Sequence, residues 1–321
     1  MSRPVCVGID VGGTKFVAGA LAADGTVLER RRVATPRRDA DALLDQLVDL
    51  ASDLGPGLPV GVGIAGIVDR TGTIRYGPNL GVTDLPLAAL LGERLGVRVA
   101  VRNDASVALL GEQRAGAGAG VDDVVMLTLG TGVGGGVMLG GRLVEGAHGL
   151  GGELGHVIVH DGGRLCPCGN AGCLEAYASG TAIAARAHDR LATGAVASVL
   201  LDGELDELDG KRVTAAALGG DAFAREVLEE VGHWLGVGIA SLVNAFDPEL
   251  VIVGGGAGTH AADLVLPTAR RVAAERTMGA AHRPPARIEL AALGDDAGMV
   301  GAGLLARDLF EDDLRSSEET P

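Results

Sequence analysis

The stretch that decides the fold is VCVGIDVGGTKFVAGAL, residues 5–21. It consists of an apolar run, a Gly-Gly-Thr-Lys loop at 12–15 and a second apolar run at 16–21. A turn at 24–25 and a third apolar run at 26–28 follow. Apolar runs joined by Gly-rich loops and turns are typical of a meander of β-hairpins.

The same order of elements recurs about 118 residues further along the chain. The apolar run 124–129 (VVMLTL) leads into a Gly-Thr-Gly loop at 130–132, a further strand at 136–139 and a Gly-Gly turn at 140–141. The identity between the copies is weak, but the repeated order predicts two related lobes with a cleft between them.

Helical patterns lie outside these two units. Apolar residues recur at helical spacing over 39–54 and over 222–246, where Asp247-Pro248 ends the pattern. A last apolar helix is expected over about 298–310. We expect the following domains: a smaller N-terminal α/β domain at 1–115 joined by that last helix, a larger C-terminal α/β domain at 116–297, a hinge region at 114–123 and a flexible tail at 311–321.

Composition and charge narrow the class of protein. A formal net charge of −15 argues against nucleic acid as a partner, because no basic stripe is available to release counterions. No apolar stretch is long enough to span a membrane, and no signal peptide is visible. Three of the four cysteines lie within eight residues, which indicates metal binding in a reducing compartment. We therefore expect a cytoplasmic protein.

The Gly-rich loops indicate nucleotide binding. The pattern G-x-G-x-x-G occurs at 61–66 and 130–135, but a strand rather than a helix follows the second, and no P-loop motif is present. The loops at 10–15 and 130–134 would instead offer backbone N–H groups to phosphates across the cleft, with Asp10 holding Mg²⁺ through water. A third loop, at 254–257, suits an adenosine wall. The predicted nucleotide-binding residues are Asp10, Gly12, Gly13, Thr14, Lys15, Gly130, Thr131, Gly132, Gly134, Gly255 and Gly256.

A candidate base follows a short strand. Asn103-Asp104 comes directly after the run 97–101 and opens a helix, so an ordinary helix N-cap is one interpretation. A carboxylate at a strand end in a cleft is also where a general base takes a hydroxyl proton during phosphoryl transfer.

A second cluster of polar residues lies between 153 and 175. His156, Cys166, Cys168 and Cys173 could complete a tetrahedral Zn²⁺ site, and four protein ligands indicate a closed, structural one. Glu153 and Glu175 flank the site. Together with His156 and Asn103, these carboxylates form a set of acceptors suited to a polyol.

These motifs together resemble the ROK sugar kinases (repressor, open reading frame, kinase). The resemblance is carried by Ile9–Lys15, Asn103-Asp104, Leu129–Gly134, the block Glu153–Glu175 and Leu293–Gly298, and it covers essentially the whole chain. It implies a duplicated actin-like, ribonuclease-H-like α/β fold of two domains with ATP in the interdomain cleft. Members of the family phosphorylate the 6-hydroxyl of a hexose.

The resemblance also implies roles for single residues. Asp104 would deprotonate the sugar 6-hydroxyl. The expected substrate-binding residues are Gly66, Asn79, Asn103, Glu153, His156 and Glu175. His156 and the three clustered cysteines would bind zinc, and the two Gly-rich loops would hold the ATP phosphates.

The leading hypothesis is a glucokinase that uses Mg-ATP, binds a structural Zn²⁺ and forms a homodimer or homotetramer. Another hexose remains open as the substrate: N-acetylglucosamine, N-acetylmannosamine, mannose or fructose. Polyphosphate as the donor and a non-catalytic sugar sensor are further alternatives. A repressor would carry a helix-turn-helix ahead of the first phosphate strand, and the strand starts here at Val5, which argues against a regulatory role.

Overall fold

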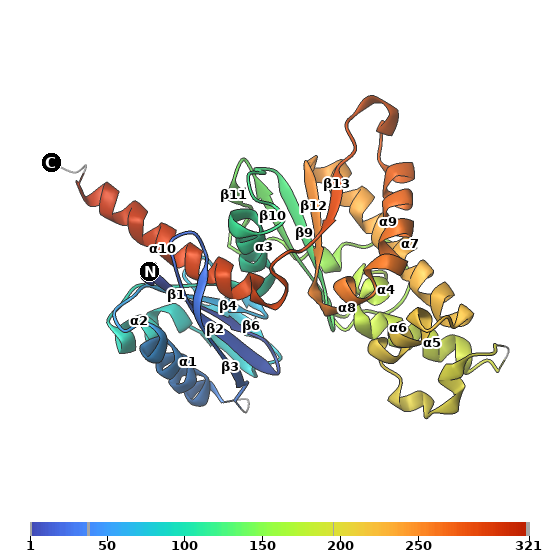
Figure 1. Ribbon diagram of the computed structural model, residues 1–321, viewed down its shortest axis with the longest axis horizontal. Helices are drawn as coiled ribbons and strands as arrows, with labels where there is room; N and C mark the ends of the chain where they lie inside the picture. Colours follow the sequence, from blue (N-terminus) through green and yellow to red (C-terminus); the bar gives the residue numbers. More distant parts are fainter. Residues whose placement is uncertain (1, 37–38, 195, 319–321) are drawn as a thin grey trace. The chain divides into compact units, whose positions relative to one another are not determined.

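The computed structural model describes residues 2–36, 39–194 and 196–318, with only the backbone described for 310–318. The chain divides into two compact units (Figure 1). Unit 1 consists of Met1–Asp122, Gly136–Gly152 and Ala292–Pro321, and unit 2 consists of Asp123–Gly135 and Glu153–Ala291. The domain bounds of 1–115 and 116–297 remain a prediction, and the units differ from them by placing 116–122, 136–152 and 292–297 in unit 1.

Two five-stranded sheets have matching strand orders, β3-β2-β1-β4-β8 and β11-β10-β9-β12-β13. In the first, β1 pairs antiparallel with β2 and parallel with β4, and β4 pairs parallel with β8. In the second, β10 pairs antiparallel with β11, and β12 pairs parallel with β9 and β13. The first sheet comprises β1 (Cys6–Val11), β2 (Lys15–Leu21), β3 (Val27–Ala34), β4 (Val60–Ile64) and β8 (Val99–Asn103). The second comprises β9 (Val124–Leu129), β10 (Val133–Leu139), β11 (Arg142–Leu143), β12 (Leu250–Gly254) and β13 (Arg287–Leu290).

The helices of unit 1 cover both faces of its sheet. They are α1 (Ala40–Leu54), α2 (Leu87–Leu95), α3 (Asp104–Ala115) and α10 (Ala297–Glu318). Val7 and Ile9 of β1 pack with Leu47 of α1 in one core cluster, while Cys6 packs with Met299 of α10 in another. This division follows from the two-residue period of a strand, which sends alternate side chains to opposite faces.

Glycines let α10 lie unusually close to its neighbours. A Cβ atom on Gly8 of β1 or Gly61 of β4 would overlap backbone carbonyl oxygens of α10. At the crossing of α3 and α10, a Cβ on Gly111 or Gly301 would overlap the backbone of the opposite helix. The glycine content of the chain is therefore used in part for backbone packing rather than for ligand loops.

A small third sheet and the remaining helices complete the units. The third sheet joins β5 (Ile67–Val68), β6 (Ile74–Gly77) and β7 (Val82–Leu85) within unit 1. The helices of unit 2 are α4 (Glu175–Ala178), α5 (Gly180–Leu191), α6 (Gly210–Leu218), α7 (Ala222–Phe246), α8 (Gly255–His260) and α9 (Ala262–Arg276). Short 3₁₀ turns occur at Leu154–His156, Val199–Asp202, Leu205–Glu207, Ala280–His282 and Gly294–Asp296.

The last helix is longer than the sequence pattern predicts. Helix α10 continues to Glu318, so the expected end near residue 310 was wrong and the predicted tail is helical up to that point. The physical reason is that 311–318 contain neither Gly nor Pro, so nothing interrupts the backbone hydrogen bonding. Among the residues that the structure describes, no helix is both long and apolar enough to cross a bilayer.

Candidate functional site

Asp10 and Asp104 lie at the ends of two parallel strands that flank β4. Asp10 is opposite Gly63 in the register of β1 and β4, and Asp104 directly follows β8. A Cβ atom placed on Gly63 would lie 3.6 Å from both Asp10 Oδ1 and Asp104 Cα. Gly63 has no side chain that would separate Asp10 from the start of α3, and the negative charge of Asp104 acts on Asp10.

The surroundings raise the pKa of both carboxyl groups. Burial, and next the negative charge of Asp104, raise the pKa of Asp10 to about 7. Burial likewise raises the pKa of Asp104, although its Oδ1 accepts the N–H of Ala105 at 2.9 Å, which acts in the opposite direction. A carboxyl group whose pKa lies above its ordinary range is suited to accepting a proton near neutral pH.

The loop of residues 12–15 is the tight connection of the β1–β2 hairpin. Gly12 N–H donates to the Lys15 carbonyl at 3.0 Å, and Thr35 Oγ1 donates to the Gly12 carbonyl at 2.7 Å. Gly13 and Thr14 are exposed, so ligand atoms can approach this part of the backbone. Asn79 lies beside the loop, since a Cβ on Gly13 would be 3.5 Å from Asn79 Cβ.

Asn103 connects the helix that carries Asp104 to a neighbouring loop. Its Oδ1 accepts the N–H of Ser106 at 3.1 Å, so the N-cap interpretation from the sequence is correct. Its Nδ2 donates to the carbonyl of Gly66, also at 3.1 Å. Gly66 has φ +158° and a side chain there would meet the Tyr76 carbonyl, so this position favours glycine. In this way the structure joins two of the predicted sugar-binding residues.

Lys15 has an ionic partner that the sequence analysis did not identify. Its Nζ lies 2.6 Å from Asp295 Oδ2, and Arg32 lies 2.9 Å from the same oxygen. The hydrogen bond from Lys15 is the main cause that lowers the pKa of Asp295. Asp295 belongs to the Leu293–Gly298 motif, which gave no hint of a charge partner because it lies 280 residues away from Lys15.

In unit 2, the loop between β9 and β10 is held by the start of the helical region. Gly130 N–H donates to the Gly132 carbonyl at 2.9 Å, and Gly180 N–H donates to the Gly130 carbonyl at 2.8 Å. Thr181 Oγ1 donates to the Thr131 carbonyl at 2.7 Å. Gly134 follows within β10. The side chain of Thr131 is not used in these bonds and the residue is exposed.

The third predicted loop lies next to this one. Gly255 has φ +78°, and a Cβ on it would overlap the carbonyl of Leu129, the residue before Gly130. No atom lies within 4 Å of a Cβ position on Gly256, so the space beside it is open. The parallel pairing of β9 and β12 explains why the loops that follow these strands are neighbours.

Glu175 connects the Gly-rich loop to the cysteine cluster. Its Oε2 accepts the N–H of Val133 at 2.9 Å, and a Cβ on Gly132 would overlap the same carboxylate. Its Oε1 lies 3.5 Å from Cys166 Sγ, which donates to it. Glu153 lies just before the 3₁₀ turn of His156, and its carbonyl accepts the His156 N–H at 3.1 Å.

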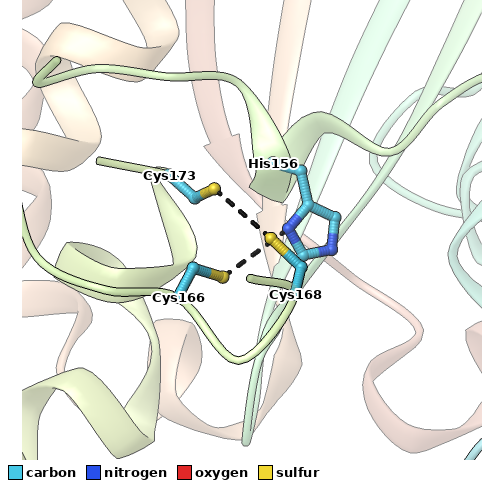
Figure 2. A group of neighbouring side chains, drawn as sticks. All are labelled: His156, Cys166, Cys168 and Cys173. Carbon is cyan, nitrogen blue, oxygen red and sulfur yellow. Dashed lines mark hydrogen bonds between the residues drawn. The ribbon is translucent and has the colours of Figure 1, made fainter. Parts of the chain in front are cut away.

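His156, Cys166, Cys168 and Cys173 converge on one point (Figure 2). Their candidate ligand atoms all lie within 4.8 Å of one another. The Cys168 and Cys173 sulfurs are 3.7 Å apart, and Cys166 Sγ is 3.8 Å from His156 Nδ1. Four ligands at about 2.3 Å from a central Zn²⁺ in a tetrahedron would be separated by about 3.8 Å. The donor set and its spacing therefore fit zinc.

Two glycines form the turns of the segment that carries the cysteines, and an aromatic pair packs next to it. Gly169 (φ +95°) and Gly172 (φ +91°) adopt left-handed conformations, and the Cys166 N–H donates to the Asn170 carbonyl at 2.8 Å. Next to the cluster, His160 stacks on Trp234 with ring centroids 5.4 Å apart. The only tryptophan of the chain thus contacts the segment that carries the cysteines.

The predicted site residues thus form two groups, one in each unit. Unit 1 holds Asp10, Gly12, Gly13, Thr14, Lys15, Gly66, Asn79, Asn103 and Asp104. Unit 2 holds Gly130, Thr131, Gly132, Gly134, Glu153, His156, Cys166, Cys168, Cys173, Glu175, Gly255 and Gly256.

Two sheets of matching strand order, each with a Gly-rich hairpin loop beside its central strand, define a duplicated actin-like, ribonuclease-H-like two-domain fold of the α/β class. The fold class expected from the sequence is thereby confirmed. The chain belongs to the ROK family, whose sequence model matches residues 6–309. The resemblance noted from the motifs is confirmed as well.

Individual relatives agree with this assignment. A glucokinase from Streptomyces coelicolor is 39% identical over 310 residues, which are 94% of this chain and 97% of that protein. The crystal structure of a ROK family glucokinase from Streptomyces griseus in complex with glucose and AMPPNP is 42% identical, with a TM-score of 0.82, covering 94% of this chain and 99% of that one. An N-acetylmannosamine kinase from Escherichia coli O157:H7 is 35% identical over 305 residues, which are 93% of this chain and 97% of that protein.

Proposed function

We propose that this protein transfers the γ-phosphoryl group of ATP to the 6-hydroxyl of glucose. The observation that carries the proposal is the position of Asp104, at the start of α3 beside Asp10, with a pKa raised by burial. Glucokinases of the same family that are similar over more than nine-tenths of the chain support glucose as the acceptor.

In this proposal Asp104 accepts the proton of the 6-hydroxyl while the oxygen attacks phosphorus. Asn103, Glu153, His156 and Glu175 hold ring hydroxyls, helped by Gly66 and Asn79. Each carboxylate can accept two hydroxyl hydrogen bonds, which fixes the orientation of the sugar. Positioning of this kind supplies much of the rate in phosphoryl transfer, because the protein itself forms no covalent bond.

The backbone of residues 12–15 and 130–134 would hold the phosphates of ATP, and the open space beside Gly256 would take the adenosine. Asp10 would hold Mg²⁺ through water, since a carboxylate at the end of β1 is a hard oxygen ligand of the kind that this ion prefers. The ion would supply positive charge to the phosphate oxygens. Lys15 would add a second positive charge once its Asp295 contact is shared with phosphate.

We also propose that the four-residue cluster binds a structural Zn²⁺. Its four ligands leave no open position for a substrate, and their spacing fits a tetrahedron. Glu175, whose carboxylate lies 3.5 Å from Cys166 Sγ, would then be a sugar ligand next to a zinc ligand. A cytoplasmic location, a homodimer or homotetramer, and domains at 1–115 and 116–297 are part of the same proposal.

Kinase activity on another hexose is the second candidate, and the 35% identity to an N-acetylmannosamine kinase favours it over the remaining alternatives. The deciding experiment is ADP release from Mg-ATP with each hexose in turn, including the N-acetylated ones. Selective turnover with glucose is the expected result. Selective turnover with another hexose would change the substrate but keep the residue roles, whereas sugar binding without turnover would favour a sensor.

A further inference from the structure

The carboxylate of Glu112 is fully buried. Among the residues that the structure describes, its hydrogen-bond donors are all backbone N–H groups. It lies near the end of α3 and is 0% exposed. Oε2 accepts the N–H groups of Ala117 at 2.8 Å and Ala292 at 3.0 Å, and Oε1 accepts that of Leu293 at 2.7 Å. A carboxylate offers only acceptors, so it matches three converging donors.

The three donors lie close to two of the four places where the chain passes from one unit to the other. The first connector, residues 116–122, precedes the passage into unit 2 between 122 and 123. The second connector, residues 292–296, follows the return between 291 and 292. One side chain therefore binds two segments that are about 175 residues apart in sequence.

The neighbours of Glu112 are shaped to hold the first connector. A Cβ on Gly116 would overlap the Glu112 carboxylate, so this position must be small. The adjacent Gln113, which is also buried, donates from Nε2 to the Val121 carbonyl at 3.1 Å. The end of α3 thus fixes this connector at its beginning and near its end.

The second connector leads directly to groups beside the proposed phosphate loop. Asp295 within it contacts Lys15, and Asp296 lies 2.6 Å from Arg30. The chain then enters α10, where a Cβ on Gly298 would lie 2.8 Å from Asp10 Cγ. A displacement of residues 292–293 would therefore be passed on to Lys15 and Asp10.

We infer that Glu112 is a positioning residue for phosphoryl transfer, because it fixes both connectors and, through the second one, the groups around Asp10. This inference rests on the proposed function. Glu112 is not among the residues proposed to bind sugar or nucleotide, and no motif of the sequence singled it out.

The test compares Glu112→Gln with Leu47→Ala. The glutamine keeps the shape of the side chain but turns an N–H₂ group toward N–H donors, so part of the clamp is lost. Leu47 is a buried residue of α1 in the same unit, away from both connectors, and serves as the control for lost stability. Both variants are assayed well below their melting temperatures, where they are fully folded.

We expect kcat with glucose and Mg-ATP to fall about 10- to 100-fold in Glu112→Gln, because small misplacements of reacting groups have effects of this size. Leu47→Ala should stay within about twofold of the wild type even if its Tm is lower. Amide hydrogen exchange at Ala117, Ala292 and Leu293 should accelerate in Glu112→Gln only. Glu112→Asp, which keeps the charge at a shorter reach, should restore part of kcat and serves if the glutamine variant does not fold.

Equal kcat in Glu112→Gln and Leu47→Ala would overturn the positioning role. Unchanged exchange at the three amides would contradict the clamp itself, and this measurement needs no turnover. A wild-type protein that phosphorylates no hexose would contradict the proposed function instead, so the two failures are distinguishable.

Discussion

At the scale of the residue, the proposed role of Asp104 as the base can be tested separately from sugar binding. Replacing it with Ala removes the proposed base but leaves the other sugar ligands in place. We expect kcat to fall by about 10²- to 10⁴-fold with glucose binding retained. Coupled ADP release and calorimetric titration with glucose measure the two effects separately. Turnover near that of the wild type would rule out Asp104 as the base.

The raised pKa of Asp10 predicts how the stability of the protein changes with pH. Its pKa of about 7 lies above the ordinary value near 4, so between these values the folded state binds more protons than the unfolded state and stability falls as pH rises. Asp10→Asn cannot titrate. In Mg²⁺-free buffer the free energy of unfolding of this variant should therefore rise relative to that of the wild type between pH 4 and pH 8. The expected difference at pH 8 is about 1–3 kcal/mol.

Asp69 is a matching control, because its pKa is lowered whereas that of Asp10 is raised. The hydroxyl of Thr71 is the main cause that lowers its pKa to about 2, so its contribution is present above the ordinary pKa of an aspartate and is lost as pH falls toward 2. Asp69→Asn should therefore destabilise the protein most at neutral pH. Thermal unfolding across pH measures both variants, and parallel curves for Asp10→Asn and wild type would contradict the raised pKa.

At the scale of the element, the segment 156–173 is expected to depend on its metal. Cys168→Ala removes one of four ligands, so bound zinc should drop well below one per chain and both Tm and glucose affinity should decrease. Metal analysis, thermal unfolding and the fluorescence of Trp234 report these changes. Cys6→Ala is the control, because Cys6 is buried in β1 and outside the cluster. Wild-type protein without zinc would refute the premise.

The crossing of α3 and α10 gives a second prediction at this scale. Gly301→Ala would place a methyl group on the backbone of α3, at the Val107 carbonyl, and should cost about 1–3 kcal/mol. In Gly92→Ala of α2 the nearest atom would be 3.3 Å away, so this control should change stability little and gain some helix propensity. Chemical denaturation measures both. Equal effects would mean that the helices can separate easily.

At the scale of the whole molecule, unit 1 depends on the last helix. Met299, Val300 and Leu304 of α10 cover the face of the sheet formed by Cys6, Val17 and Leu21. A chain ending at residue 291 should therefore leave this face open and show no cooperative unfolding of unit 1. A chain ending at 309 keeps these contacts and should retain activity. Near-UV circular dichroism and ADP release compare the two, and a well-folded short form would contradict the role assigned to α10.

Much of the fold could be predicted because apolar runs, Gly-rich loops and residue spacings are local features of the sequence. The repeated order of runs and Gly-rich loops indicated two sheets, and the spacing of His156 and the cysteines indicated their cluster. The contacts of Glu112 with Ala292 and of Lys15 with Asp295 could not be predicted, since they join positions 180 and 280 residues apart. Such contacts are set by how helices lie on sheets, and no local periodicity encodes them.

The three-segment construction of unit 1 has a consequence for synthesis on the ribosome. Translation proceeds from the N-terminus, so β1, β2 and β4 emerge early, while α10 is made last. Until then the part of the first sheet that α10 covers, formed by Cys6, Val17 and Leu21, stays open, although all of unit 2 has already been translated. The part of the protein that is made first is therefore finished last, and its uncovered sheet is the surface that a nascent-chain chaperone would have to protect from aggregation.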